Sequence, residues 1–159
     1  MREIKIESVV SMYQMDELDE TEQMLVKKAM EATDNSYAKY SNFHVGAALI
    51  LNNGKVVIGA NQENAAYPVT LCAERTAIFA AQANYPDQPV KALAIAARNA
   101  NGFLEDPISP CGSCRQVILE VEERYRQPIK ILLYGTKGIF VVDSIKDLLP
   151  LSFVEDCLY

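Results

Sequence analysis

The fold is decided by one stretch of the chain, FHVGAALILNNGKVVIG, which spans residues 43–59. Two runs of β-prone residues, at 43–51 and 56–59, flank an Asn-Gly pair at positions 53 and 54. Asn-Gly between two such runs is the strongest short-range signal of an antiparallel hairpin. The stretch therefore predicts two neighbouring strands joined by a tight turn.

Helical patterns lie on both sides of this hairpin. The one on its N-terminal side has a cap signature, since Asp19 is followed three residues later by Glu22. The predicted helices span residues 16–35, 72–85 and 111–125, and Ser144 caps a further short helix that ends before Pro150.

Strand-like runs alternate with these helices. The predicted strands after the hairpin span residues 90–97, 129–134 and 139–142. Apart from Lys91, the first of them is apolar, as expected for a strand covered on both faces of a sheet. Ile4 and Ile6 alternate with charged residues and predict a short edge strand. A hairpin followed by this alternation predicts an α/β layered domain with a mixed sheet.

Composition and charge narrow the class of function. The chain has 159 residues, of which 50% are hydrophobic and 23% charged, as is typical of one globular domain. Its formal net charge of −6 argues against nucleic acid or an anionic membrane surface as a partner. No apolar run approaches the roughly 20 residues that a membrane helix needs, and the charged N-terminus has no apolar signal core. We expect a cytoplasmic protein.

The candidate chemistry is concentrated in two cysteine segments. TLCAER, residues 70–75, contains Cys72, and SPCGSCR, residues 109–115, contains Cys111 and Cys114. Each group opens a predicted helix, and the partial positive charge of a helix N-terminus favours thiolates. Three sulfur ligands and one open position are typical of a catalytic zinc ion, whereas structural zinc sites usually have four protein ligands.

Glu74 and two arginines lie beside these cysteines in the sequence. A zinc enzyme also needs a proton carrier next to the metal, and Glu74 follows Cys72 by two residues. Because positions i and i+2 of an ideal helix face nearly opposite ways, we predict that Cys72 occupies the helix cap or the first turn, where its side chain points off the end beside Glu74. Arg75 and Arg115 could donate hydrogen bonds to sulfur and offset the charge of three thiolates around one zinc ion.

Two other interpretations of the cysteines stay open on the residues alone. A purely structural zinc module would need a fourth protein ligand, for which Cys157 is the candidate. A thiol oxidoreductase would cycle a disulfide between Cys111 and Cys114 without any metal. That second interpretation leaves Cys72 and Glu74 without a role.

The order and spacing of the motifs resemble the zinc-dependent cytidine deaminase superfamily. Cys-Ala-Glu at 72–74 is followed, after 110 − 74 − 1 = 35 residues, by Pro-Cys-x-x-Cys at 110–114. This superfamily includes a three-cysteine variant in which the glutamate is not a zinc ligand. Three further stretches resemble the family: YAKYSNFHVGAA (37–48), NQENAAY (61–67) and LLPLSF (148–153). Cysteine rather than histidine at position 72 favours the small tetrameric nucleoside branch.

The resemblance implies a fold and a reaction. The fold would be a three-layer α/β/α sandwich with a mixed sheet, a single domain over residues 1–159 in which about residues 1–20 extend beyond the family pattern. The reaction would be the zinc-dependent hydrolytic deamination of cytidine and 2′-deoxycytidine to uridine and 2′-deoxyuridine, with release of ammonia, as in pyrimidine salvage. A blasticidin-type or other aminopyrimidine deaminase would share the site and differ in substrate.

The resemblance also implies how the metal is bound. One Zn²⁺ per chain would be held by Cys72, Cys111 and Cys114, and Glu74 would shuttle protons. His44, the single histidine of the chain, matches no fixed position of the family and is expected to be a bystander.

The nucleoside contacts follow from the same resemblance. Phe43 would pack against the pyrimidine ring, and the backbone of Ala73 would meet the base edge. Asn61 and Glu63 would bind the ribose hydroxyls, for which an amide and a carboxylate are chemically suited. In a homotetramer, a neighbouring subunit would contribute three further residues to the pocket: Ala65, Tyr67 and Phe153.

Overall fold

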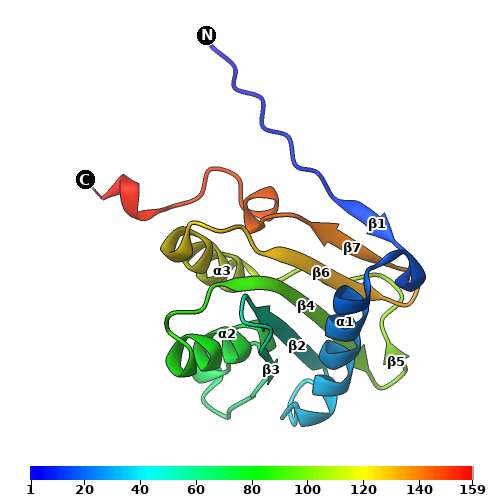
Figure 1. The fold of residues 1–159 in the computed structure, drawn as a ribbon. Coiled ribbons are helices and arrows are strands. Elements are labelled where there is room, and N and C mark those ends of the chain that lie inside the picture. The colour runs from blue at the N-terminus through cyan, green and yellow to red at the C-terminus, as the bar shows by residue number, and fades with distance from the viewer. Residues whose placement is uncertain (159) are drawn as a thin grey trace.

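The computed structural model describes residues 1–158, which form one mixed sheet with helices packed on it (Figure 1). The strands are β1 Ser11–Tyr13, β2 His44–Leu51, β3 Val56–Ala60, β4 Val90–Asn99, β5 Gly102–Phe103, β6 Lys130–Gly135 and β7 Gly138–Val142. The α-helices are α1 Glu20–Ala32, α2 Ala73–Asn84 and α3 Gly112–Tyr125. Short 3₁₀ helices are η1 Met15–Glu17, η2 Thr33–Asn35, η3 Tyr67–Val69, η4 Ile145–Leu148 and η5 Glu155–Cys157. Within residues 1–158, none of the helices has the length and apolar character needed to span a bilayer.

The sheet is built on the predicted hairpin. Its strand order is β1-β7-β6-β4-β2-β3, with β5 paired to β4. β2 and β3 are antiparallel, with Ala48 opposite Ile58, and Gly54 in the turn has a φ of +82° that favours glycine. β4 and β6 are the parallel pair of this sheet, and the chain between them contains α3 as the crossover that such a pair requires.

Alternate residues of the central strands face two separate cores. In β2, Ala47, Leu49 and Leu51 pack with α2 and α3, whereas Ala48 and Ile50 pack with α1. Figure 1 shows α1 on one side of the sheet and α2 and α3 on the other. The predicted three-layer α/β/α sandwich is therefore confirmed.

Two glycines let helices lie directly against strands. A Cβ on Gly46 would collide with the backbone of Ala29 in α1, and one on Gly59 would collide with the backbone of Ala73 and Ala77 in α2. The first turn of α2 therefore rests on β3, which fixes the position of the residues at the start of that helix.

The first helix begins later than its pattern predicts. α1 starts after Asp19, whose Oδ1 accepts from Glu22 N at 2.8 Å, while Glu22 Oε2 accepts from Asp19 N at 3.2 Å. The predicted cap is thus confirmed, but residues 15–17 form the separate turn η1 because the reciprocal cap at Asp19 ends one element and starts the next.

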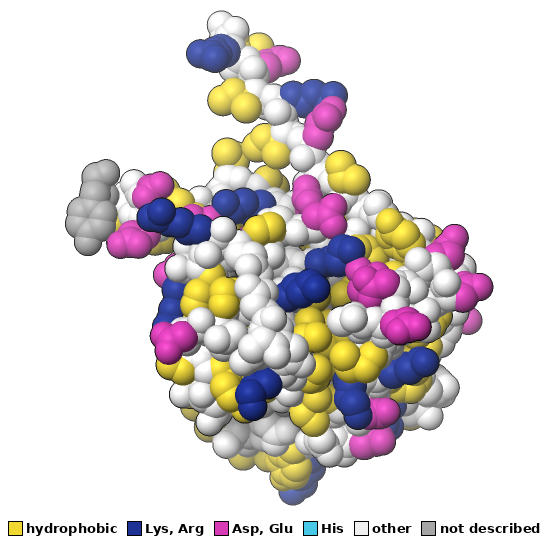
Figure 2. All heavy atoms as spheres, in the orientation of Figure 1, with side chains coloured by type: hydrophobic (Ala, Val, Ile, Leu, Met, Phe, Trp, Pro, Cys, Tyr) yellow, Lys and Arg dark blue, Asp and Glu magenta, His cyan; other side chains and the backbone are white. Residues whose placement is uncertain are grey.

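The predicted edge strand at Ile4 and Ile6 is wrong. Alternation favours an extended backbone, but a strand also needs a neighbouring edge, and β7 pairs with Ser11–Tyr13 instead. Residues 1–10, here called the N-terminal arm, extend away from the body (Figure 1). Charged and hydrophobic side chains alternate along the arm (Figure 2), and Ile4 and Ile6 are exposed.

The buried carboxylate of Glu122 ties α3 to the end of the sheet. Its Oε1 accepts from Ile129 N and Ile145 N, both at 2.9 Å, and its Oε2 accepts from Ser144 Oγ at 2.7 Å. Glu122→Ala leaves these donors without partners, so we expect it to lower the free energy of unfolding by about 3 kcal/mol or more. Urea unfolding measures this loss. Glu120→Ala, at an exposed position of the same helix, is the matched control, and equal losses in both variants would contradict the role of the carboxylate.

Candidate active site

Two of the three clustered cysteines are helix caps. Cys72 is the N-cap of α2 and Cys111 the N-cap of α3, each with an extended backbone, while Cys114 is buried in the first turn of α3. The prediction that Cys72 lies at the cap or in the first turn of its helix is thus confirmed, and the structure places it at the cap. Because Gly59 seats α2 against β3, the sheet positions one of these two helix ends.

The three sulfur atoms are spaced for one metal ion. Cys72 Sγ lies 3.9 Å from Cys111 Sγ, and Cys111 Sγ lies 3.6 Å from Cys114 Sγ. All three sulfurs lie within 4.8 Å of one another. Tetrahedral zinc with Zn–S bonds of about 2.3 Å separates two sulfur ligands by roughly 3.8 Å. The residues present therefore fit a zinc ion with one coordination position left for a small molecule, and among residues 1–158 Cys157 is not part of this group.

Glu74 lies in the wall beside the sulfurs. It is the second residue of α2, its residue is only 4% exposed, and it lines the same cavity as Cys72 and Cys111. Burial raises the pKa of its carboxyl group above the usual range. Its place next to two of the sulfurs puts a proton-carrying group where a hydrolytic zinc enzyme needs one.

The arginines beside the cysteines have different roles. Arg75 Nη2 donates to Cys72 Sγ at 3.4 Å, as the sequence predicts. The pKa of the Cys72 thiol falls to about 5, chiefly because of its hydrogen bond with Cys114 and also because of Arg75. The corresponding prediction for Arg115 is wrong: its Nε donates to Pro110 O at 2.8 Å and its Nη1 to Leu148 O at 2.6 Å. Backbone carbonyls are stronger acceptors than sulfur, which accounts for this choice.

Arg75→Gln tests the contact with sulfur. We expect the variant to bind zinc about 10–100-fold more weakly, because groups that hydrogen-bond to metal ligands contribute that much to affinity. Competition with a chromogenic chelator measures the affinity. Arg124→Gln is the matched control, since Arg124 bonds to Gln82 and Pro86 instead of to a sulfur. If the two variants bound zinc equally well, the contact would have no such role.

A cavity of about 480 Å³ opens beside the cysteines and is large enough for a small organic molecule. It combines the predicted residues Phe43, Asn61, Glu63 and Ala73 with Glu74 and two of the three clustered cysteines. The complete lining is Ser41, Phe43, Val45, Asn61, Glu63, Thr70, Leu71, Cys72, Ala73, Glu74, Ile108, Ser109 and Cys111.

Asn61 holds the wall of the cavity together. Its Oδ1 accepts from Val45 N at 2.8 Å, and its Nδ2 donates to Phe43 O at 2.9 Å. These bonds anchor the backbone on both sides of His44 to the end of β3. The amide oxygen and the amide nitrogen each retain one further hydrogen-bonding position, so Asn61 can also contact a ligand.

Glu63 is held by the loop that precedes β2. Its Oε2 accepts from Tyr40 N at 2.7 Å and from Ser41 N at 3.3 Å, and Ser41 Oγ donates to its Oε1. The Ser41 donor holds the pKa of the Glu63 carboxyl below its usual range. Sequence reasoning missed Ser41 as part of the site, and only its place two residues before Phe43 in the family-like segment hinted at it.

Three of the predicted contact residues do not line the cavity of their own chain. Ala65 and Tyr67 lie in the segment between β3 and α2, and Phe153 lies near the C-terminus. Tyr67 and Phe153 are 70% and 59% exposed. The structure thus leaves these side chains available at the surface, and it does not bring them to the sulfurs.

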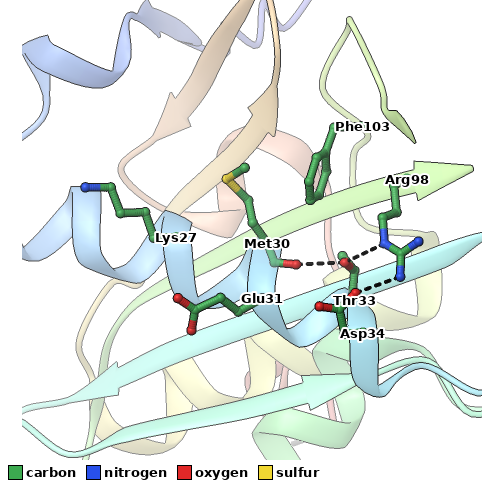
Figure 3. A pocket seen from close by; sticks show the side chains of 7 residues that line it. All are labelled: Lys27, Met30, Glu31, Thr33, Asp34, Arg98 and Phe103. Atoms are coloured by element: carbon green, nitrogen blue, oxygen red, sulfur yellow. Dashed lines mark hydrogen bonds and ion pairs between the residues drawn. The ribbon is translucent and has the colours of Figure 1, made fainter. Parts of the chain in front are cut away.

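A wider groove of about 530 Å³ lies away from the cysteines (Figure 3). It is formed by the end of α1, by Arg98 of β4 and by Phe103 of β5. Arg98 Nε donates to Thr33 Oγ1 at 2.9 Å, and its Nη2 donates to Asp34 Oδ1 at 2.8 Å. The guanidinium is therefore engaged with its own chain, and the groove holds none of the predicted site residues.

Three clustered cysteines beside a buried glutamate and a cavity are the arrangement of a zinc-dependent enzyme. Comparison with known proteins specifies the class. Residues 19–126 match the family model described as cytidine and deoxycytidylate deaminase zinc-binding region. The chain is similar to a cytidine deaminase of Halalkalibacterium halodurans, with 40% identity over 134 residues that cover 84% of this chain and 95% of that protein. For a cytidine deaminase of Sporosarcina psychrophila the identity is 39%, over 84% of this chain and 92% of that protein.

A solved structure shows the same similarity. The crystal structure of cytidine deaminase from Burkholderia pseudomallei matches with a TM-score of 0.71 at 41% identity, covering 82% of this chain and 97% of that one. The chain belongs to the cytidine and deoxycytidylate deaminase family. The family predicted from the motifs is therefore confirmed, as is the prediction of a zinc cofactor, which both the family model and the sulfur cluster support.

Proposed function

We propose that this enzyme deaminates cytidine and 2′-deoxycytidine by hydrolysis, giving uridine or 2′-deoxyuridine and ammonia. The observation that carries the proposal is the junction of three cysteine sulfurs and Glu74 with a cavity that also contains Phe43, Asn61 and Glu63. We assign metal binding, proton transfer and ribose binding to these neighbouring groups.

Glu74 moves the protons of the reaction. Bound zinc, held by the three cysteines, supplies the Lewis acidity that makes water a usable nucleophile near neutral pH. The water oxygen forms a bond to C4 of the pyrimidine, and the bond from C4 to the amino nitrogen breaks. The Glu74 carboxylate delivers one water proton to N3 and the other to the departing amino group, which leaves as ammonia.

The remaining residues bind and orient the nucleoside. Phe43 packs against the pyrimidine, and the backbone of Ala73 meets the base edge at the start of α2. The Glu63 carboxylate accepts hydrogen bonds from the ribose hydroxyls. The Asn61 amide can accept hydrogen bonds from them and donate hydrogen bonds to them. Since both side chains are already fixed by bonds to the protein, they lose little conformational freedom when the nucleoside binds.

Ammonia release by protein of known zinc content tests the proposal. The substrates are cytidine, 2′-deoxycytidine, their monophosphates and free cytosine. We expect turnover of the two nucleosides alone. A preparation with one zinc per chain that released ammonia from neither nucleoside would overturn the substrate assignment, and turnover of blasticidin S instead would identify the alternative reaction.

We further propose that the chain is a single deaminase domain that assembles as a cytoplasmic homotetramer with shared sites. The exposed side chains of Tyr67 and Phe153 support an interface, because aromatic residues are enriched where protein chains contact one another. Ala65, Tyr67 and Phe153 would reach a neighbour's cavity across it. The four free cysteines support a reducing compartment.

Co-expression of two defective variants tests the sharing of sites. Glu74→Gln removes the proton carrier of its own chain, and Phe153→Ala removes the residue given to the neighbour. In a mixed assembly, a chain with intact Glu74 receives Phe153 from the other variant, so we expect activity above that of either variant alone. Activity equal to the mean of the two homogeneous preparations would show that each chain works by itself.

A further inference from the structure

The ring of His44 is bonded at both nitrogens. Its Nε2 lies 3.2 Å from Asn42 Oδ1, and its Nδ1 contacts Ser36 Oγ. An amide oxygen can only accept, so Nε2 carries the proton in the neutral ring and the Ser36 hydroxyl donates to Nδ1. The ring therefore bridges two points of one loop, residue 36 at its start and residue 42 at its end.

This loop holds Glu63 in place. Tyr40 and Ser41 supply all three donors to the Glu63 carboxylate. At its start the loop is fixed by the backbone, since Tyr37 N donates to Asn61 O at 2.9 Å and Glu63 N donates to Tyr37 O at 2.8 Å. The donors themselves lie beyond these bonds, in the second half of the loop.

The second half of the loop depends on an unusual backbone conformation. Asn42 has a φ of 52°, in the left-handed region that asparagine visits more readily than most residues but that still requires support. The Asn42 side chain is bonded to His44, which is itself fixed in β2. The backbone of Asn42 donates to Ala38 O at 2.9 Å, and His44 holds its side chain, so both support the residue that directly follows the Ser41 donor.

We propose that His44 is a positioning residue for recognition of the ribose hydroxyls, acting through Asn42 and Ser41 on Glu63. The inference rests on the proposed function, in which Glu63 binds those hydroxyls. It replaces the expectation from sequence that His44 is a bystander. His44 itself does not line the cavity, so it affects the nucleoside only through the loop.

Steady-state kinetics with two nucleosides test the proposal. For His44→Ala we expect the KM for cytidine to rise about tenfold with little change in kcat, as for the loss of one hydrogen bond to a charged group. The Ki of 2′,3′-dideoxycytidine, which lacks the 2′- and 3′-hydroxyls, should stay unchanged. Asn42→Gly keeps the left-handed backbone accessible but removes the side chain, and should reproduce the effect. His44→Gln keeps a donor for Asn42 and should restore most of the affinity.

Thr33→Val is the matched control for loss of stability. Thr33 is buried beside α1 and bonds to Met30 O and Arg98 Nε, without contact to the loop donors (Figure 3). We expect this variant to lower the melting temperature and to leave both constants unchanged. Suppose that the wild type deaminates cytidine. If His44→Ala then raised the KM of cytidine and the Ki of the dideoxy analogue equally, or raised neither, the positioning role would be overturned. The proposed function would still stand. A wild type without activity on cytidine would overturn the proposed function itself.

Discussion

Glu74→Gln is expected to bind one zinc per chain and to lose at least two to four orders of magnitude in kcat. The substitution preserves the size of a side chain that is nearly fully buried, so the cavity and the cysteine cluster should keep their shape. It removes the group that carries protons to N3 and to the leaving amine. Proton transfer by a positioned side chain contributes about 10²–10⁴-fold, and this reaction uses two such transfers.

Zinc content and turnover are measured on the same preparation. Glu31→Gln, at an exposed position of α1, is the matched control, since it makes the same chemical change away from the cavity. A zinc-loaded Glu74→Gln protein that kept more than about a tenth of the wild-type kcat would exclude Glu74 as the proton carrier. Loss of zinc together with activity would instead assign Glu74 a role in holding the metal.

Cys114→Ser is expected to abolish both zinc binding and activity. Cys114 is fully buried, and its sulfur is the third corner of the metal site. Serine replaces a thiolate by a hydroxyl group that is protonated near neutral pH and is therefore a poor zinc ligand. The metal also stabilises the fold by binding the native state, so the melting temperature of the wild type should fall when a chelator is added. That of Cys114→Ser should not respond to the chelator.

Cys157→Ser is the matched control for the loss of a thiol. Cys157 is exposed and lies outside the sulfur cluster, so we expect this variant to keep stoichiometric zinc and full activity. Loss of zinc in Cys157→Ser would support the four-ligand structural site. Full activity of a metal-free protein would favour chemistry at Cys111 and Cys114 without zinc.

Local patterns were sufficient to predict most of the sheet and the two helix starts that carry the clustered cysteines. The Asn-Gly turn predicts the β2–β3 hairpin, and Asp19 with Glu22 predicts the start of α1. The position of Cys72 at the cap or in the first turn follows from helix geometry, because positions i and i+2 within a regular helix face nearly opposite ways. These features depend on residues that are neighbours in the sequence.

Features set by distant partners could not be predicted. β1 forms where β7 offers an open edge, and β5 is only two residues long, so the local sequence alone does not predict where these two strands lie. Arg115 turns to the carbonyls of Pro110 and Leu148, and the second is more than thirty residues away. The role of Ser41 and His44 around Glu63 likewise requires the loop and β3 to meet in space.

The open edge at β1 limits how the protein can be engineered. β1 ends the strand order, so its outward backbone groups have no strand beside them in the described chain. Residues 9–13, VVSMY, carry no charge and have high β propensity, a composition that promotes stacking of chains into aggregates. Lys5 and Glu7 before this segment and Asp16 after it act as gatekeepers against such stacking. Substitution of these charged residues by neutral ones would let this edge pair with other chains and promote aggregation. An apolar peptide fused to the N-terminal arm would have the same effect.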